Sequence, residues 1–134
     1  MTLASDLAAA IGPANVLTGT DMTRYARDWM GRYEGQPVAV ARPGSTAEVA
    51  ACVKVAAQHG LPVVPISGNT GLVGGTMTRG GLLLALDRMN RIREVKRDAK
   101  LVIAEAGVIL TRLHEAAEAQ GLYFPLWFGA RGSA

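Results

Sequence analysis

Cysteine is nearly absent from this sequence, and other residue types are scarce as well. One of the 134 residues is a cysteine, Cys52, so no disulfide can form within the chain and a small disulfide-stabilised scaffold is excluded. Aromatic residues make up 5% and charged residues 19%, whereas 49% are hydrophobic. This hydrophobic fraction is too high for an intrinsically disordered chain. The length is typical of a single domain.

Positive charge is in small excess. The chain has 14 Lys and Arg against 11 Asp and Glu, which gives a formal net charge of +3. Basic residues are densest between 88 and 100, but Glu94 and Asp98 interrupt them and no aromatic side chains alternate with them. This pattern is typical of a solvated hairpin face rather than of a nucleic-acid interface. We therefore expect no nucleic-acid partner.

Long hydrophobic runs are missing too. No segment approaches the roughly 18 apolar residues that a membrane span needs. The first residues have no basic start and include Asp6 within their apolar stretch, unlike a secretion signal. They predict instead a short helix over 3–11 that ends near Gly12. We expect a cytoplasmic protein with no transmembrane segment.

Residues for metal chemistry are few. His59 falls near a predicted helix end, where a donor or cation helps to satisfy the last carbonyls. His114 falls mid-helix beside glutamates, as expected of a solvated face. Two histidines with no cysteine nearby cannot form a closed zinc site. The sequence therefore predicts no metal site.

The middle of the chain has the pattern of an α/β unit. The runs 38–41 and 62–66 are apolar throughout, as in parallel strands that are covered on both faces. We expect them to form a parallel pair joined by a right-handed crossover. Further along we expect a strand over 82–86, a hairpin of strands over 92–96 and 101–106 with its turn at 97–100, and a second amphipathic helix over 109–120.

The helix between the first two strands has clear ends. Ser45 and Glu48 have the spacing of a capping box, in which each side chain satisfies a backbone N–H at the helix start. Gly60 supplies the left-handed stop. The apolar stripe expected to face the sheet consists of Val49, Cys52, Val53 and Ala56.

The most informative segment is PVVPISGNTGLVGGTMTRGG, which begins with the second strand. Glycines occupy positions 68, 71, 74 and 75. Glycine lets the backbone adopt positive φ and approach a ligand closely, and successive inward N–H groups form a nest suited to phosphate or pyrophosphate. Because no Lys or Arg lies between 67 and 76, backbone dipoles and the hydroxyls of Ser67 and Thr70 would hold such an anion.

Two familiar phosphate loops are excluded. A Walker-A loop needs Lys after its last glycine, where this chain has Thr76. The dinucleotide fingerprint G-x-G-x-x-G is absent, because Asn69 and Thr70 separate Gly68 from Gly71. Composition alone leaves two other interpretations open, a flexible surface loop and a tight turn that needs glycine for steric reasons.

VVPISGNTGLVGG closely resembles the pyrophosphate loop of the PCMH-type FAD-binding domain of the vanillyl-alcohol oxidase and p-cresol methylhydroxylase superfamily. The resemblance continues, in the family's order, through VARPGSTAEVAACVKVAAQHGLPVVP, LLLALDRMNRI, VIAEAGVIL, GLYFPL and ARGSA. RDWMGRYEGQ and NTGLVGG are most similar to the D-2-hydroxyacid dehydrogenases. This group contains D-2-hydroxyglutarate dehydrogenase, D-lactate dehydrogenase and the corresponding polypeptide of glycolate oxidase.

The resemblance implies a fold of the α/β (α+β) class. A first, small parallel βαβ lobe is expected, followed by the beginning of a second, antiparallel lobe. The FAD-binding domain would cover residues 35–134, after an amino-terminal lead-in over 1–34. Because the family's chains are much longer, we expect this domain to be incomplete at its carboxyl end.

The resemblance also implies the site. The loop from Pro65 to Gly71 would bind the FAD pyrophosphate through backbone N–H groups. Covalent members often have a histidine in this loop, where this chain has Asn69 and Thr70, so we expect non-covalent FAD. Ser67 replaces a commoner glycine, which requires negative φ there. The full set of expected FAD-binding residues is Pro65, Ser67, Gly68, Asn69, Thr70, Gly71, Gly74, Gly75, Gly107, Pro125, Gly132 and Ser133.

The implied reaction is oxidation of a D-2-hydroxyacid to a 2-oxoacid by hydride transfer to FAD, with electrons passing to an unidentified acceptor. Catalytic and metal-binding residues would lie in a substrate domain beyond residue 134, so the chain alone is expected to be inactive. Two alternatives remain open. One is an oxidase of the same superfamily that acts on an alcohol or sugar, and the other is a nucleotide-binding fragment without activity.

Overall fold

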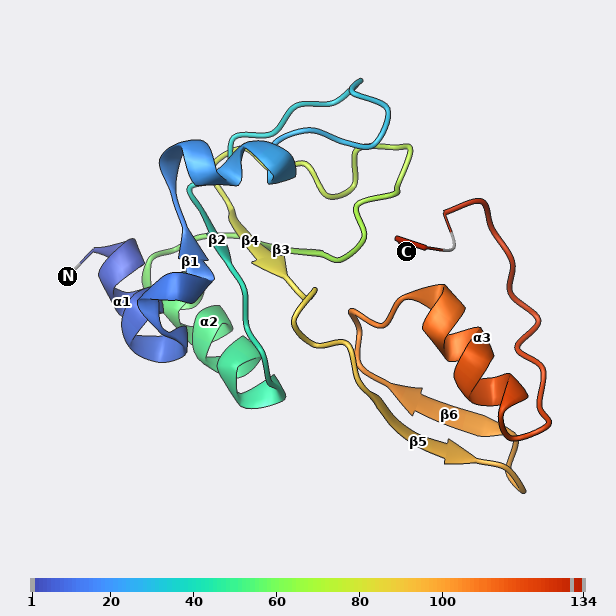
Figure 1. Ribbon diagram of the computed structural model, residues 1–134. Coiled ribbons are helices and arrows are strands. Elements are labelled where there is room, and N and C mark those ends of the chain that lie inside the picture. The colour runs from blue at the N-terminus through green and yellow to red at the C-terminus, as the bar shows by residue number, and fades with distance from the viewer. Residues whose placement is uncertain (1, 131, 134) are drawn as a thin grey trace.

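The computed structural model describes residues 2–130 and 132–133, which form two lobes (Figure 1). The first lobe has the helices α1 (Leu3–Ile11) and α2 (Thr46–Gln58), the short 3-10 helices η1 (Pro13–Asn15) and η2 (Gly19–Tyr25), and the strands β1 (Val16–Leu17), β2 (Ala39–Ala41), β3 (Val63–Ile66) and β4 (Leu82–Ala85). The second lobe has the strands β5 (Ile92–Lys96) and β6 (Leu101–Ala104) and the helix α3 (Leu110–Glu118). The predicted helices and the hairpin are confirmed.

The strand order of the first sheet is β1-β2-β4-β3. Leu83 of β4 pairs in parallel with Val40 of β2 on one side and with Val64 of β3 on the other. The predicted direct pairing of the runs 38–41 and 62–66 is therefore wrong, although both strands are parallel members of one sheet. All four residues of β4 are buried, which explains why this strand takes the central position.

Both faces of this sheet are covered. Successive strand residues point to opposite faces, so Ala39 and Ala41 pack on one side and Val40 on the other. Helices α1 and α2 cover the first side, as Figure 1 shows, with Leu7 and Cys52 fully buried there. The second side is closed by η2. Together the two sides form the core of the first lobe.

Helix α2 begins and ends where the sequence predicts. The Ser45 side chain accepts a hydrogen bond from the Glu48 N–H at 3.2 Å, but the Glu48 carboxylate accepts from the Gly44 N–H at 2.7 Å rather than from Ser45. Gly60 has φ of 65° and ends the helix. Val53, predicted on the buried stripe, is 44% exposed, because it lies at the edge of the face that contacts the sheet.

The two histidines hold elements together. Nε2 of His59 lies 2.8 Å from Oδ2 of Asp6, so the end of α2 is tied to α1. His114 is 7% exposed, and its Nε2 lies 2.9 Å from the Leu126 carbonyl oxygen. The predicted solvated position of His114 is wrong, because the segment after α3 folds back and places Trp127 against the imidazole, with 4.2 Å between ring centroids.

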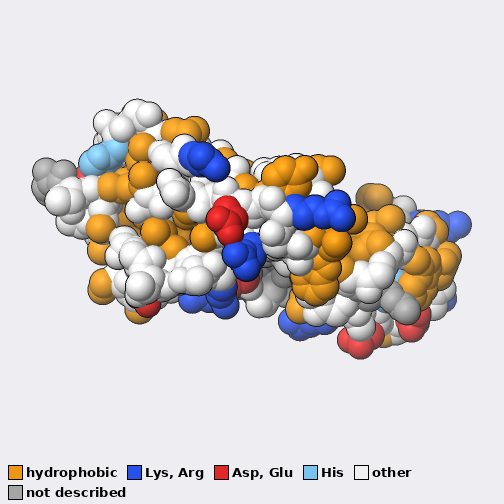
Figure 2. Space-filling model, turned by 90° about the horizontal axis from the view of Figure 1, so that it is seen from above, with side chains coloured by type: hydrophobic (Ala, Val, Ile, Leu, Met, Phe, Trp, Pro, Cys, Tyr) orange, Lys and Arg blue, Asp and Glu red, His pale blue; other side chains and the backbone are white. Residues whose placement is uncertain are grey.

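The basic residues of the second lobe are exposed, as predicted, but two of them have a buried partner. Arg91 and Arg93 approach Oε1 of Glu105 at 2.9 and 3.4 Å, and the Glu105 side chain is fully buried. Hydrogen bonds from Arg91 lower the pKa of Glu105 to about 2. On the face shown in Figure 2, Lys and Arg side chains are scattered among hydrophobic ones rather than gathered in one stripe.

No helix within residues 2–130 is long and apolar enough to span a membrane.

Candidate functional site

The glycine-rich loop connects the carboxyl end of β3 to the amino end of β4. Because these strands are parallel neighbours, the loop leaves the sheet where the strands end and must return to where they begin (Figure 1). Its first residues, Ser67 to Gly71, lie just beyond the carboxyl end of β3. Ligands of parallel α/β sheets bind beyond the carboxyl ends of the strands. The fold therefore places the predicted pyrophosphate loop where an anion site is expected.

Backbone donors of the loop are available to a ligand. Among the hydrogen bonds of the described residues, none is donated by the backbone N–H groups of residues 68–71. A Cβ atom added at Gly71 would have no heavy atom within 4 Å, so the space beside it is open. Ser67 is outside the set of residues with positive φ, as its replacement of glycine requires. These features fit a cradle for a phosphate group.

Asn69 gives the loop its shape. It has φ of 52°, in the left-handed region that asparagine tolerates better than most residues. Its Nδ2 donates to the Arg27 carbonyl oxygen at 2.9 Å, and its Oδ1 accepts from the Thr76 hydroxyl at 2.7 Å. Both ends of the amide are thus used within the protein. The side chain braces the loop, while the Asn69 N–H donates no hydrogen bond among the described residues.

The lead-in segment also contacts the loop at Gly74. Gly74 has φ of 70°, and a Cβ there would lie 2.7 Å from Cγ of Tyr33. Tyr33 is held in turn by Asp28, whose carboxylate accepts from the Tyr33 N–H at 2.8 Å. This hydrogen bond lowers the pKa of Asp28. Residues 27–36 therefore form an outer support for the loop, a role that the sequence pattern of the lead-in does not reveal.

Two pockets adjoin the loop. The smaller, of about 290 Å³, is lined by Arg24, Tyr25, Ser67, Gly68, Asn69 and Asp87. The larger, of about 550 Å³, is lined by Trp29, Thr70, Gly71, Leu72, Phe128, Gly129 and Ala130. The first is polar and charged, whereas large apolar side chains line the second. The loop thus lies between two environments of different chemistry.

Arg24 is a site residue that the sequence pattern does not reveal. It belongs to η2, far from the loop in sequence, and the fold brings it to the smaller pocket. Its guanidinium lies 3.6 Å from Oδ2 of Asp87, the oxygen that also accepts a 2.7 Å hydrogen bond from Arg42. Burial raises the pKa of Asp87, but Arg42 and Arg24 outweigh this effect and the net shift is downward. No local periodicity in the sequence signals this cluster.

Five of the twelve predicted residues line the two pockets, and seven do not. The seven are Pro65, Gly74, Gly75, Gly107, Pro125, Gly132 and Ser133. Gly107 lies where the lobes meet, and its N–H donates to the Met89 carbonyl oxygen at 2.8 Å. The carboxyl-terminal segment reaches the larger pocket instead through residues 128–130. The roles of these seven residues in binding FAD remain predictions from the resemblance.

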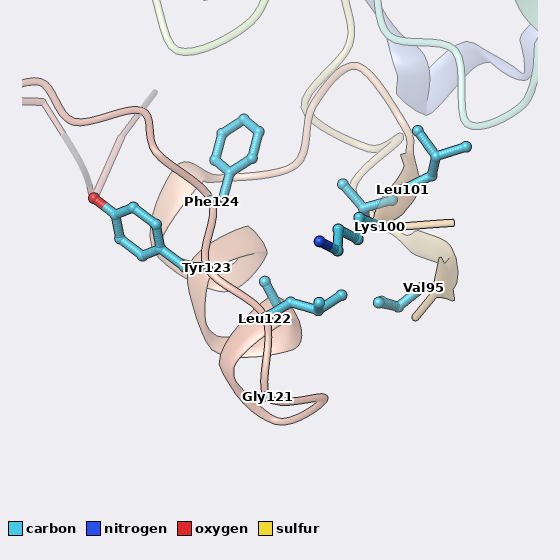
Figure 3. A pocket seen from close by; sticks show the side chains of 9 residues that line it. Val95, Lys100, Leu101, Gly121, Leu122, Tyr123 and Phe124 are labelled. Atoms are coloured by element: carbon cyan, nitrogen blue, oxygen red, sulfur yellow. The ribbon is translucent and has the colours of Figure 1, made fainter. Parts of the chain in front are cut away.

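A third pocket, of about 370 Å³, lies in the second lobe (Figure 3). It separates the β5–β6 hairpin from the segment after α3, and its walls include Val95, Leu101 and Leu122. Lys100 extends into it from the hairpin turn (Figure 3). No residue of the glycine-rich loop lines it, so it is separate from the candidate site. Among residues 2–130 and 132–133, no group of three or more His, Cys, Asp or Glu is arranged to hold a metal.

Comparison with known families identifies the domain that contains the glycine-rich loop. The sequence profile described as "FAD binding domain" matches residues 37–134. The chain belongs to the FAD-binding domain family. The cofactor of the domain is FAD, and the free N–H donors and open space of the loop fit it.

The FAD-binding domain has curated relatives among hydroxyacid dehydrogenases. It is 41% identical over 114 residues to D-2-hydroxyglutarate dehydrogenase of Xanthomonas citri pv. viticola, covering 84% of this chain and 24% of the relative. It is 36% identical over 118 residues to D-lactate dehydrogenase of Anaerostipes hadrus, covering 86% of this chain and 25% of the relative. The chain thus spans about a quarter of the length of these relatives.

Solved structures confirm the fold. The FAD-binding domain matches 4-ethylphenol oxidase from Gulosibacter chungangensis with a TM-score of 0.85 and 28% identity, over 98% of this chain and 27% of that one. It matches p-cresol methylhydroxylase with a TM-score of 0.81 and 25% identity, again over 98% and 27%. The predicted PCMH-type architecture, a parallel lobe followed by the start of an antiparallel one, is confirmed.

Proposed function

We propose that this FAD-binding domain serves a flavin-dependent dehydrogenase that oxidises a D-2-hydroxyacid, of the D-2-hydroxyglutarate or D-lactate class, to a 2-oxoacid. The observation that carries the proposal is the similarity to relatives named for these activities, and the unused backbone N–H groups of the glycine-rich loop support it. Bound FAD would accept the hydride that leaves the hydroxyl-bearing carbon. The described residues bind and orient the cofactor, and the proposed location of the protein is the cytoplasm.

Within the site we propose different roles for the loop and for the larger pocket. The N–H groups of residues 68–71 would bind the pyrophosphate, since they donate to no other group of the described chain. The larger pocket, with Trp29, Leu72 and Phe128, offers apolar side chains to an uncharged part of the cofactor. Neither pocket is lined by His or Cys, which supports non-covalent attachment.

Titration of the chain with FAD tests the binding role. Flavin fluorescence and absorbance follow binding, FMN and ADP serve as competitors, and circular dichroism reports whether the chain is folded. Saturable binding with competition by ADP supports the proposal. Absence of binding by a folded chain contradicts it for this polypeptide.

A substitution at Gly71 sharpens the test. Gly71→Val would place a side chain in the open space beside the loop, where an added Cβ meets no heavy atom within 4 Å. The variant should fold normally and lose FAD affinity, because the added atoms occupy the cofactor's space. Ala50→Val, on the exposed side of α2, adds comparable bulk away from the loop and should bind FAD as the parent does.

The substrate class is tested with the longest polypeptide that the gene encodes. Reduction of bound flavin is followed after anaerobic addition of D-2-hydroxyglutarate, D-lactate or their L-enantiomers. Rapid reduction by a D-2-hydroxyacid alone supports the proposal. Reduction by a simple alcohol or a sugar instead would assign the protein to a different oxidase of the superfamily.

A further inference from the structure

We propose that Arg24 binds a phosphate group of the cofactor from outside the glycine-rich loop and supplies the positive charge that the loop lacks. This inference rests on the proposed binding of FAD at the loop. Residues 67–76 contain no Lys or Arg, so the loop offers only backbone dipoles and hydroxyls to two phosphates. Arg24 lines the same pocket as Ser67 and Gly68.

Arg24 is the less closely paired of the two arginines at Asp87. The carboxylate of Asp87 is engaged by Arg42 at 2.7 Å, with Arg24 farther away at 3.6 Å. One carboxylate and two guanidinium groups leave a net charge of +1. The Arg24 side chain is 63% exposed and that of Arg42 is 28% exposed, so Arg24 is the one that an anion in the pocket can reach.

The guanidinium of Arg24 is also held in place. It lies over the Tyr25 ring, 4.5 Å from the ring centroid, and donates to the Tyr25 hydroxyl. Tyr25 is itself buried in the core against Val40 and Leu83. A guanidinium fixed on a rigid platform loses little freedom when it binds, and its planar fork matches a phosphate. Arg24 therefore lines the smaller pocket beside the first residues of the loop, with its guanidinium held by Tyr25.

This arrangement predicts which ligands respond to Arg24. A nucleotide with a diphosphate, such as FAD or ADP, would contact the guanidinium, whereas adenosine carries no phosphate and would not. Charge attraction in an exposed pocket is screened by salt. Removal of Arg24 should therefore weaken diphosphate ligands selectively and reduce the salt dependence of their binding.

The experiment compares Arg24→Gln, Arg24→Lys and the parent chain. Dissociation constants for FAD, and inhibition constants for ADP and adenosine as competitors, are measured at several salt concentrations. Arg97→Gln is the matched control, because it removes an exposed arginine from the turn between β5 and β6. We expect Arg24→Gln to weaken FAD and ADP roughly tenfold, as loss of a charge-assisted hydrogen bond does, and to flatten their salt dependence. Arg24→Lys should fall between, and Arg97→Gln should match the parent.

The outcomes separate the two proposals. If the parent chain binds no FAD, the proposed function fails. If the parent binds FAD and Arg24→Gln binds it as tightly as Arg97→Gln does, only the role of Arg24 is overturned. Equal weakening of ADP and adenosine, with an unchanged salt slope, would also overturn it, because that result identifies a structural effect. Should Arg24→Gln unfold, Arg24→Lys keeps the charge and Arg24→Met removes it. A tighter affinity for ADP in Arg24→Lys than in Arg24→Met supports the proposal, and equal affinities in these two variants overturn it.

Discussion

A Cβ atom on Gly107 would lie 2.1 Å from the carbonyl oxygen of Leu86, so position 107 has no room for any side chain. Leu86 directly follows β4 in the first lobe, and Gly107 follows β6 in the second. The Gly107 N–H donates to the Met89 carbonyl oxygen in the same place. The close packing between the two lobes is thus sufficient to require glycine at this position.

Gly107→Ala should destabilise the chain markedly. The methyl group would overlap the Leu86 carbonyl, and overpacking of this kind costs about 1–3 kcal/mol. The midpoint of thermal unfolding should fall by roughly 5 °C or more. Gly75→Ala is the control, since a Cβ there meets nothing within 4 Å. Equal midpoints for the two variants would show that the lobes separate freely at this contact.

Asn69 should matter to FAD binding through its backbone conformation and its two side-chain bonds. Asn69→Gly keeps access to φ of 52° but loses the bonds to Arg27 and Thr76, whereas Asn69→Ala loses both the bonds and the favourable conformation. We expect affinity in the order Asn, Gly, Ala, with a step of about fivefold between Gly and Ala because left-handed backbone costs roughly 1 kcal/mol. Fluorescence titration measures the order. A higher affinity for Asn69→Ala than for Asn69→Gly would refute it.

The contact between Tyr33 and Gly74 can be tested by a double-mutant cycle. Gly74→Ala should weaken FAD binding, because the methyl group meets the Tyr33 ring and because φ is 70°. Tyr33→Ala in the same chain removes the ring and should recover the steric part of the loss, leaving the conformational part of roughly 1 kcal/mol. Strictly additive effects would mean that the ring and the glycine do not interact.

Stability should depend on Glu105 in acid. The pKa of this carboxyl is lowered from 4.5 to about 2 by its hydrogen bonds from Arg91. A lowered pKa means that the ionised form stabilises the fold above pH 4.5, and this contribution is lost as the pH falls from there towards 2. Glu105→Gln removes the titrating group, so its unfolding free energy should decline less over this pH range. Urea unfolding at pH 7, 4 and 3 compares the two chains, and parallel declines would contradict the assignment.

Cys52 should be unreactive in the folded chain. It is fully buried between α2 and the sheet, and burial raises the pKa of its thiol to about 11. At pH 8 a thiol reagent should modify it only as fast as the chain unfolds, since the thiolate is the reactive form. The rate with a chromogenic disulfide reagent, measured with and without urea, checks this. Rapid modification without urea would show that α2 opens locally.

Local signals in the sequence are sufficient to predict most of the fold. The helix over 3–11, the start of α2 at Ser45 and the turn at 97–100 depend on residues close together in the chain, and the structure confirms all three. The position of β4 between β2 and β3 is not predicted, because strand order depends on contacts between distant segments. The apolar run 82–85 is the one available indication of a central strand.

The candidate site shows the same contrast between features set by neighbouring residues and features set by distant ones. Composition and resemblance identify the glycines and polar residues of the loop, because these residues are contiguous. They do not identify Arg24, because only the folded chain brings η2 to the loop. The position of His114 is predicted wrongly for a similar reason: the helix sequence alone does not show that Leu126 and Trp127 will cover it.

The central position of β4 also sets the order of events during synthesis on the ribosome. Of the strands in the first sheet, β4 is the last to be translated, yet it pairs with both β2 and β3. Until residues 82–85 emerge, those two strands have unpaired inner edges that a chaperone or another nascent chain can contact. When β4 inserts, the loop that precedes it is anchored at both ends for the first time. Completion of the sheet and assembly of the cofactor cradle are then one step in the maturation of the nascent protein.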